Sequence, residues 1–488
     1  MTEICLVHFR LGDSLAAEVR RLALGCLLAG FSGPDVPRWL AQALADGLGG
    51  VVLFGSNIGD GTGVARLTRE LRAAAGRDVV VALDEEGGDV TRLDARRGSA
   101  SPGAAALGAL DDLASTEAAY FAIGVRLAAA GVTVDLAPVA DVNLDPRNPV
   151  IGARSFSADP AVAARHVAAA VRGLQRAGVA ACAKHFPGHG ATAADSHHGV
   201  ATVTRSREEF DAAELEPFRA AIASGTRAIM TGHLFVPALD PDALATVSRP
   251  ITTGLLRERL GFTGTIMTDA LEMRAVVDTI GIVEGFVRAL AAGADAIETG
   301  AQDAGPLVEP IVAACVQAVD DGRLSVERLA DAARRTAALA TAGAETAETV
   351  APAMDGVAAR CVEVCGVLPR LDDPLVIECR SPNGVATGEL PWSLAELITG
   401  DTISVDGPIS ADAILSRAGS RPLIVVVRDP GRHPWQRDVL DAAVRHHDSV
   451  IVDVGWPADG LPPGIPLVRT RGIAPGLLAE AARLLERP

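Results

Sequence analysis

The chain has 488 residues, of which 49% are hydrophobic and 22% are charged. This length and composition exclude a single small module and a mainly disordered chain, and they indicate two or three folded units. The 61 acidic residues outnumber the 44 basic ones, which gives a formal net charge of -17. Without a basic surplus, neither nucleic acid nor an anionic membrane surface is expected as a main partner.

Cysteine usage and the start of the chain bear on location. The seven cysteines are dispersed and odd in number, unlike a disulfide framework, which favours a reducing compartment. Charged residues interrupt the apolar start, and no run of about 18 apolar residues occurs. Neither a signal peptide nor a transmembrane helix is therefore expected, and we predict a cytoplasmic protein.

Up to about residue 340, short apolar runs alternate with longer stretches that have helical periodicity. Strands are predicted at 50–54, 79–83, 132–138, 179–183, 228–231, 265–268 and 294–297. Helices are predicted at 161–175, 207–223 and 306–320. Seven or eight such units predict an α/β fold of the (β/α)8 TIM-barrel type, whose chemistry sits at the carboxyl ends of the strands.

The pattern restarts after residues 341–352, which have the composition of a linker. Strands are predicted at the apolar runs that begin at Pro374, Pro422 and Ser449, and helices at 435–446 and 474–485. Buried strands alternating with helices predict a second, smaller α/β sandwich domain. The predicted domains are 1–345, the barrel, and 346–488, the sandwich.

Five of the ten histidines lie between residues 185 and 233, and the densest group follows the predicted strand at 179–183. There, Lys184, His185 and His189 belong to the segment KHFPGHG, and a further histidine pair follows it closely. On a barrel this segment is a loop of the catalytic face. One such residue alone could be scaffolding, but so many polar groups in one loop indicate an active site.

Two other predicted strands end in a carboxylate. Asp84 follows the strand at 79–83 and Asp269 follows the strand at 265–268, so both are expected at the same mouth. A buried carboxylate needs a cation, such as Arg92 or Arg154, or a functional reason. For Asp269 the alternative is a role as N-cap of the next helix.

Asp195 and His197 are spaced to act as a pair. If Asp195 accepts a hydrogen bond from one imidazole nitrogen of His197, the other nitrogen can transfer a proton. Asp269 would then be free to attack an electrophilic carbon. These are the two partners of a retaining glycoside hydrolysis, with histidine in place of the usual acid carboxylate.

Taken together, the motifs resemble glycoside hydrolase family 3, in its β-N-acetylglucosaminidase (β-N-acetylhexosaminidase) branch. The resemblance rests on DEEGG at 84–88 with Arg92, NPVIG at 148–152 with Arg154, KHFPGHG at 184–190 followed by DSH at 195–197, and TDAL at 268–271. The sequence departs from the family pattern at two places. The family often has an aspartate at the position of Ala191 and a Leu-Pro pair at the position of residues 200–201, and both differences bear on the shape of the loop.

The resemblance implies a retaining exo-β-N-acetylglucosaminidase that forms a covalent intermediate on Asp269. His197 would be the general acid/base and Asp195 its dyad partner. Sugar binding would fall to Asp84, Arg92, Arg154, Lys184 and His185. It implies no cofactor and no metal, and a substrate that is a small GlcNAc-containing saccharide or muropeptide, from cell-wall recycling or chitin degradation.

Several alternatives stay open at this point. Within the family, a β-N-acetylglucosaminide phosphorylase would share the Asp-His dyad, whereas the β-glucosidase branch takes its acid from a glutamate elsewhere and lacks that segment. A zinc hydrolase is a different class, with His185, His189, His197 and Asp195 as possible ligands, although no HExxH or paired-cysteine motif occurs. A non-catalytic sugar-binding protein is another. Lys184 and Arg154 could instead be buried counter-ions of the two carboxylates. The oligomeric state is not indicated.

Overall fold

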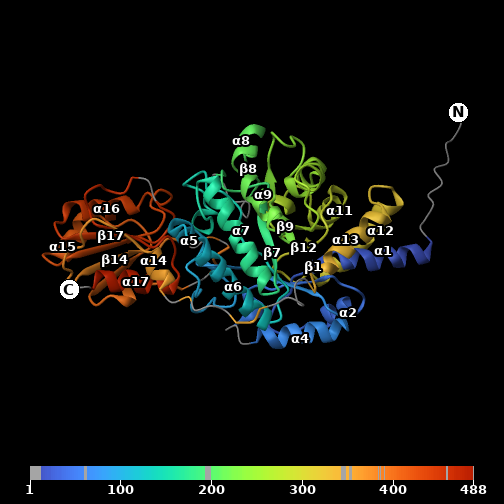
Figure 1. The fold of residues 1–488 in the computed structure, drawn as a ribbon, viewed down its shortest axis with the longest axis horizontal. Helices are drawn as coiled ribbons and strands as arrows, with labels where there is room; N and C mark the ends of the chain where they lie inside the picture. The colour runs from blue at the N-terminus through green and yellow to red at the C-terminus, as the bar shows by residue number, and fades with distance from the viewer. Residues whose placement is uncertain are drawn as a thin grey trace.

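The structure is a computed structural model that describes residues 12–59, 63–192, 199–341, 348–350, 354, 356–382, 384, 386–388, 391–457 and 460–486. Two parts are arranged along the long axis of the molecule (Figure 1). A β/α barrel carries the N-terminal part of the chain, and a smaller α/β unit lies at the opposite end from the first helices. None of the described helices has the length and apolarity that crossing a bilayer requires.

Eight parallel strands form the barrel. In sheet order they are β11 (Thr265–Thr268), β9 (Ala228–Thr231), β7 (Ala180–Phe186), β6 (Val134–Asp135), β3 (Val80–Leu83), β2 (Gly50–Val52), β1 (Leu27–Ala29) and β12 (Ile297–Glu298). A parallel bridge between Met267 and Ala296 joins the two ends of this sheet. The predicted (β/α)8 barrel is therefore confirmed.

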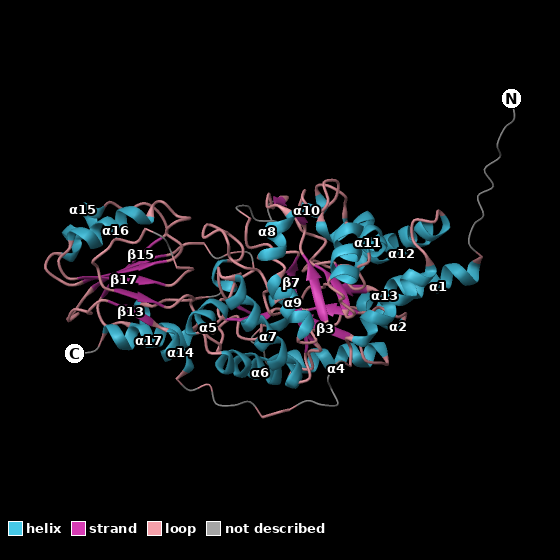
Figure 2. Ribbon diagram, turned by 45° about the horizontal axis from the view of Figure 1, so that its top comes forward, coloured by secondary structure: helices cyan, strands magenta, loops and turns pink. Residues whose placement is uncertain are grey.

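Helices surround the barrel and alternate with its strands in chain order (Figure 2). They are α1 (Asp13–Gly25), α2 (Arg38–Ala45), α3 (Gly55–Ile58), α4 (Val64–Ala75), α5 (Ala104–Leu110), α6 (Leu113–Ala129), α7 (Pro160–Arg176), α8 (Arg207–Ala212), α9 (Glu216–Ala223), α10 (Arg274–Val277), α11 (Ile282–Ala292), α12 (Gly305–Asp320) and α13 (Val326–Ala338). Short 3-10 segments occur at Gly152–Arg154 and Ala245–Val247, and a π-helical segment at Pro250–Arg259. Two small sheets pair β4 (Glu85–Gly87) with β5 (Val90–Thr91), and β8 (Ala201–Thr202) with β10 (Leu234–Phe235).

Among the eight barrel strands and the helices predicted around them, one strand is additional to the sequence prediction and one predicted helix is divided. Strand β1 was not predicted, because its three residues follow α1 almost directly and merge with the apolar residues of that helix. The single helix predicted at 207–223 is two helices, α8 and α9. Pro217 in the first turn of α9 has no amide hydrogen to donate to the preceding turn, which favours the start of a new helix there.

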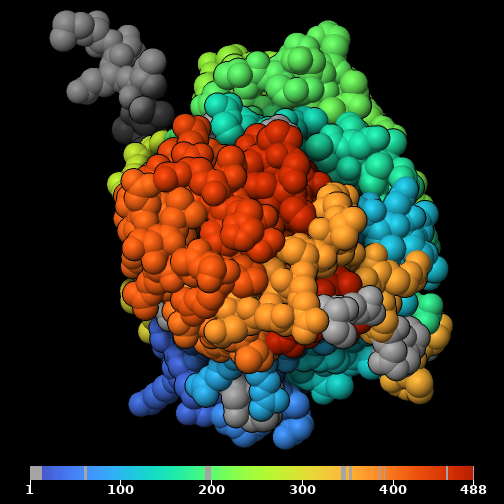
Figure 3. Space-filling view, turned by 90° about the vertical axis from the view of Figure 1, so that its left-hand side faces the viewer, coloured from blue at the N-terminus to red at the C-terminus, as the bar shows by residue number. Residues whose placement is uncertain are grey.

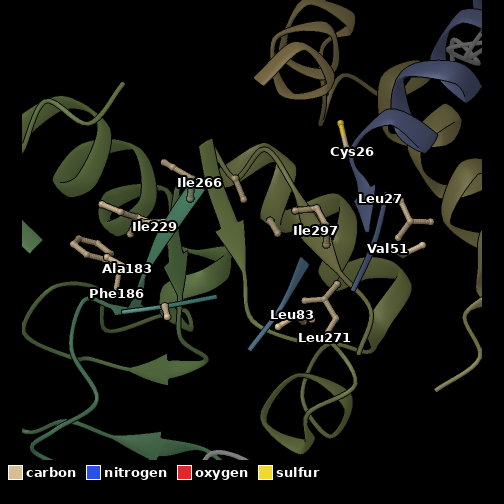
Figure 4. Packing of buried hydrophobic residues seen from close by; sticks show 14 of the residues in the cluster. Cys26, Leu27, Val51, Leu83, Ala183, Phe186, Ile229, Ile266, Leu271 and Ile297 are labelled. Atoms are coloured by element: carbon tan, nitrogen blue, oxygen red, sulfur yellow. The ribbon is translucent and has the colours of Figure 1, made fainter. Parts of the chain in front are cut away.

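Side chains of the barrel strands alternate between an inner and an outer layer. The outer layer packs against the helices and includes Leu27, Val51, Leu83, Ala183, Ile229, Ile266 and Ile297 (Figure 4). The inner layer fills the barrel and includes Val52, Ala82, Cys182, Met230, Met267 and Ala296. Leu339 and Ala340, which follow α13, pack with the inner layer and extend it. The barrel interior is thus a packed core, and a substrate site is expected at the carboxyl ends of the strands and not inside the barrel.

The smaller unit is a six-stranded sheet with helices on both faces. Its strand order is β13 (Glu363–Cys365), β18 (Leu467–Arg469), β17 (Ser449–Asp453), β16 (Leu423–Val427), β14 (Leu375–Cys379) and β15 (Asp401–Val405), and only the β13–β18 pair is antiparallel. Its helices are α14 (Val357–Cys361), α15 (Ala411–Ala418), α16 (Gln436–Arg445) and α17 (Pro475–Leu485), with a 3-10 segment at Ala395–Leu397. One apolar cluster joins the sheet to α17 and another joins it to α15 and α16. This arrangement confirms the predicted α/β sandwich.

Buried polar contacts join the two parts. Arg428 of the sandwich lies 2.8 Å from a carboxylate oxygen of Asp89, whose other oxygen accepts a hydrogen bond from the Ile473 amide at 2.8 Å. Figure 3 views the molecule from the sandwich, which forms most of that face. The predicted domain boundary at 345–346 falls in residues that the structure does not describe, and it stays a prediction.

Candidate active site

A cavity of about 260 Å³ lies at the carboxyl ends of the barrel strands. Four of its lining residues are Asp84, Lys184, Asp269 and Glu298. Each follows, by two positions, an inner-layer residue, namely Ala82 of β3, Cys182 of β7, Met267 of β11, or Ala296 directly before β12. Because side chains alternate along a strand, all four point to the barrel axis. The fold therefore gathers three carboxyl groups and one ammonium group at one strand end of the barrel.

Lys184 is the only lysine of the chain and is 2% exposed. Its ammonium lies 2.5 Å from Asp84 Oδ1 and 2.8 Å from Glu86 Oε1. Burial on its own would raise the pKa of Asp84, but Lys184 and Arg92 outweigh it and hold that pKa below its usual range. Burial on its own would lower the pKa of Lys184, but the two carboxylates outweigh it and raise that pKa. Both partners are therefore charged at neutral pH.

Arg154 binds the second carboxylate of this cluster. Its Nε and Nη2 donate to the two oxygens of Glu86 at 2.8 and 2.7 Å, a bidentate geometry. Burial opposes ionisation of Glu86, but Arg154 and Lys184 outweigh it and lower the pKa of Glu86 to about 2. Lys184 and Arg154 are thus counter-ions of Asp84 and Glu86. The sequence analysis includes Glu86 in the motif DEEGG but assigns it no role.

This arrangement predicts a loss of stability in acid. The pKa of Glu86 lies at about 2 in the folded protein and near 4.5 when unperturbed, so its contribution is present above pH 4.5 and disappears as the pH falls toward 2. We expect the free energy of unfolding to fall by about 3 kcal/mol over this range from this group. Chemical denaturation at a series of pH values measures it.

The matched control for this prediction is Glu258→Gln, at an exposed position. Glu86→Gln should be less stable than the parent at neutral pH and lose less stability on acidification, whereas Glu258→Gln should follow the parent. Parallel stability curves for Glu86→Gln and the parent would contradict the assigned charge of Glu86.

His185 is oriented by a carboxylate that the sequence analysis did not single out. Asp141 Oδ2 lies 2.7 Å from His185 Nδ1, and Asp141 Oδ1 accepts a hydrogen bond from the His189 amide at 2.7 Å. Nδ1 of His185 therefore donates to Asp141, and Nε2 of this cavity-lining residue lies 3.5 Å from Arg154 Nη2. Burial lowers the pKa of His189 to about 4, so that ring is neutral at neutral pH.

The glycines of KHFPGHG let this loop press against the barrel. A Cβ at Gly190 would lie 1.7 Å from the carbonyl oxygen of Val142, and a Cβ at Gly188 would lie 2.7 Å from Cβ of Glu214. Only glycine allows both approaches without displacing the neighbours. Lys184 and His185 belong to β7 and not to the predicted loop, and the segment after β7 that carries His189 is placed by close packing of its glycines.

Arg92 connects the cavity to the sandwich. Its Nη2 donates to Asp84 Oδ2 at 3.2 Å, and its Nη1 donates to the carbonyl oxygen of Ala386 at 2.9 Å. Ala386 also lines the cavity. The sandwich thus contributes backbone to the wall of this site.

The cavity brings together all the described residues to which the sequence analysis gave a role. These are Asp84, Arg92, Arg154, Lys184, His185 and Asp269. Asp195 and His197 lie outside the described residues. Within the described part of the chain, no group of three His, Cys, Asp or Glu residues could hold a metal ion. Two of the residues considered as zinc ligands, Asp195 and His197, are outside that part.

Residues 35–339, well over half of the chain, match the glycosyl hydrolase family 3 N-terminal domain. The chain belongs to glycoside hydrolase family 3. This family 3 protein is 35% identical over 321 residues to β-hexosaminidase A of Pseudoalteromonas piscicida, a match that covers 60% of this chain and 53% of that protein. It therefore spans about half the length of that relative. It is 36% identical over 281 residues to a β-hexosaminidase of Xylella fastidiosa, with 56% and 82% covered.

The structural comparison extends over the sandwich as well. A family 3 β-N-acetylglucosaminidase from Paenibacillus sp. FPU-7 superposes with a TM-score of 0.87 at 31% identity, and the match covers 96% of both chains. Both parts of this family 3 enzyme therefore have counterparts in one solved glycoside hydrolase.

Proposed function

We propose that this family 3 enzyme is a retaining exo-β-N-acetylglucosaminidase that hydrolyses terminal β-linked N-acetylglucosamine. The observation that carries the proposal is one small cavity that has Asp269 in its wall together with the cluster of Asp84, Lys184 and Arg92. Its volume of about 260 Å³ suits one terminal sugar rather than a long saccharide chain. The names of the similar proteins support N-acetylglucosamine as that sugar.

The proposed reaction has two steps on the anomeric carbon. In the first, the carboxylate of Asp269 attacks this carbon while His197 gives a proton to the leaving oxygen, so that the glycosidic bond breaks and a glycosyl ester forms. In the second, His197 takes a proton from water, whose oxygen attacks the same carbon and releases Asp269. Two inversions give net retention. Asp195 orients His197 by accepting a hydrogen bond.

The cation and carboxylate cluster is suited to bind sugar hydroxyls. Asp84 is ionised, and each of its oxygens, one on Lys184 and the other on Arg92, can still accept a further hydrogen bond. A carboxylate with two fixed cationic neighbours is held rigidly, so neighbouring hydroxyls on a sugar ring could both donate to it. His185 Nε2 and Arg154 are the other polar groups we assign to sugar binding.

The natural substrate we infer is a small GlcNAc-containing saccharide or muropeptide, met during cell-wall recycling or chitin degradation in the cytoplasm. The cytoplasmic location is supported by the six described cysteines, which are all free thiols, five of them buried. A reducing compartment keeps such thiols reduced.

Release of 4-nitrophenol from the β-N-acetylglucosaminide and from the β-glucoside, each with and without phosphate, tests the proposed function. We expect a preference for the N-acetyl sugar that does not depend on phosphate, and His197→Ala should lose most activity on substrates with poor leaving groups. A rate that requires phosphate would make the enzyme a phosphorylase. Absence of activity on both sugars, or preference for the glucoside, would overturn the proposal.

A further inference from the structure

Glu298 stands beside Asp269 at the end of the neighbouring strand. Met267 on β11 and Ala296, directly before β12, form a parallel bridge, and both side chains belong to the inner layer. Inward-facing side chains recur every two residues, so Asp269 and Glu298 form the next inward pair. Their main-chain segments are expected to lie about 5 Å apart, the spacing of neighbouring strands. Both residues line the cavity. The barrel therefore places a second carboxyl group next to the proposed nucleophile.

The backbone fixes this placement. The Glu298 amide donates to Thr268 Oγ1 at 3.1 Å, and the Glu298 carbonyl accepts a hydrogen bond from the Leu271 amide at 3.0 Å. Thr268 and Leu271 flank the segment that carries Asp269. The two carboxyl groups are thus held on main-chain segments that are bonded to each other on both sides.

The surroundings of Glu298 do not favour a charge. The residue is 3% exposed, and its Oε2 has no hydrogen-bond partner in the described structure. The described residues also give it no ion pair, and the ammonium of Lys184 is already bound to Asp84 and Glu86. Burying a carboxylate without a partner is far more costly than burying the neutral acid. The geometry therefore favours the protonated form.

Most of the charged groups that face Glu298 also favour the uncharged form, whereas Lys184 opposes it. Burial raises the pKa of Glu298 well above its usual range, and the carboxylates of Asp269 and Asp84 raise it further. Lys184 lowers it by less, and Glu272 raises it slightly. An uncharged carboxyl group can donate a hydrogen bond, as a carboxylate cannot.

We propose that Glu298 is a positioning residue of this enzyme, an uncharged carboxyl group that donates a hydrogen bond to the carboxylate of Asp269. The proposal rests on the role of Asp269 as nucleophile proposed above. The bond stabilises the negative charge of Asp269 and restricts its rotation without placing a second negative charge beside it. The proton stays on Glu298 throughout, so the two-step reaction keeps its balance.

Infrared difference spectroscopy tests the charge state without reference to activity. Only a protonated carboxyl group shows the carbonyl stretch of a carboxylic acid, so Glu298→Gln should lack part of that band at neutral pH. Glu258→Gln, at an exposed position, should leave the band unchanged. Asp135 and Glu85, whose pKa values are also raised by burial, contribute equally to all spectra and cancel. An undiminished band in Glu298→Gln would overturn the proposal.

Kinetics with an activated aryl N-acetylglucosaminide test the hydrogen bond. Glu298→Gln stays neutral and keeps a donor, so kcat should stay within about threefold of the parent. Glu298→Leu has no donor, and kcat should fall about ten- to a hundredfold with little change in KM. Equal kcat values for the two variants would overturn the proposal. If the parent cleaves no glycoside, the proposed function fails, whereas the infrared result still decides whether Glu298 is charged.

Discussion

Asp269→Ala is expected to lose about 10⁴- to 10⁶-fold in kcat, because alanine has no nucleophilic group and the covalent intermediate cannot form. Added azide should restore turnover on an activated aryl glycoside, since the small anion fits the space that the carboxylate leaves. The product should be the α-glycosyl azide, because azide attacks from the face that Asp269 occupied. Steady-state rates and NMR of the product measure both effects.

The matched control is Asp278→Ala. Asp278 is exposed at the end of α10 and pairs with Arg274 on the surface, so its removal should leave kcat within about twofold of the parent. Full activity of Asp269→Ala, or a β-glycosyl azide as product, would contradict the role of Asp269 as nucleophile on the α face of the sugar.

The barrel could be predicted from the sequence because strands buried on both faces are continuous apolar runs. Elements that lack such a run were missed. Strand β1 is short and follows α1 directly, and β15 at the sheet edge has the mixed sequence DTISV with three exposed residues. Apolar runs report burial on both faces, so strands that are buried on one face or are very short give no comparable signal.

Within the site, the residues that could be predicted from the sequence are those that directly follow an apolar strand. Asp84, Lys184 and Asp269 were found because each polar residue directly follows an apolar strand, and such residues point inward at the active end of a barrel. Glu298 has the same signal, since it follows the predicted strand at 294–297, but it was not singled out.

Two further contacts had no local signal. Asp141 lies in a loop without periodicity, and its contact with His185 joins residues 44 positions apart. The hydrogen bond from Arg92 to Ala386 joins residues 294 positions apart through a backbone oxygen. Side-chain type and spacing carry no information about a partner of that kind, which depends on how the two parts of the chain pack.

Lys184→Met is expected to lower both stability and activity. Asp84 and Glu86 would lose the cation they share, and breaking a buried ion pair on one side costs about 3–5 kcal/mol in the free energy of unfolding. The pKa of both carboxyl groups should rise, so acid unfolding should begin at a higher pH than in the parent. With Asp84 no longer held, kcat/KM on the N-acetylglucosaminide should fall about a hundredfold or more. Denaturation curves and initial rates measure these effects.

Lys184→Arg separates charge from geometry. The other 43 basic residues that make up the 44 are all arginine, so a lysine at this one position is not a matter of composition. An ammonium is compact and fits between Asp84 Oδ1 and Glu86 Oε1, whereas a guanidinium is larger and planar and would meet Arg154, which already occupies the other side of Glu86. We expect Lys184→Arg to recover part of the stability lost in Lys184→Met but not its kcat/KM. Recovery of kcat/KM to the parent value would mean that positive charge alone is required, and would contradict the inference that the ammonium geometry positions Asp84 for the sugar.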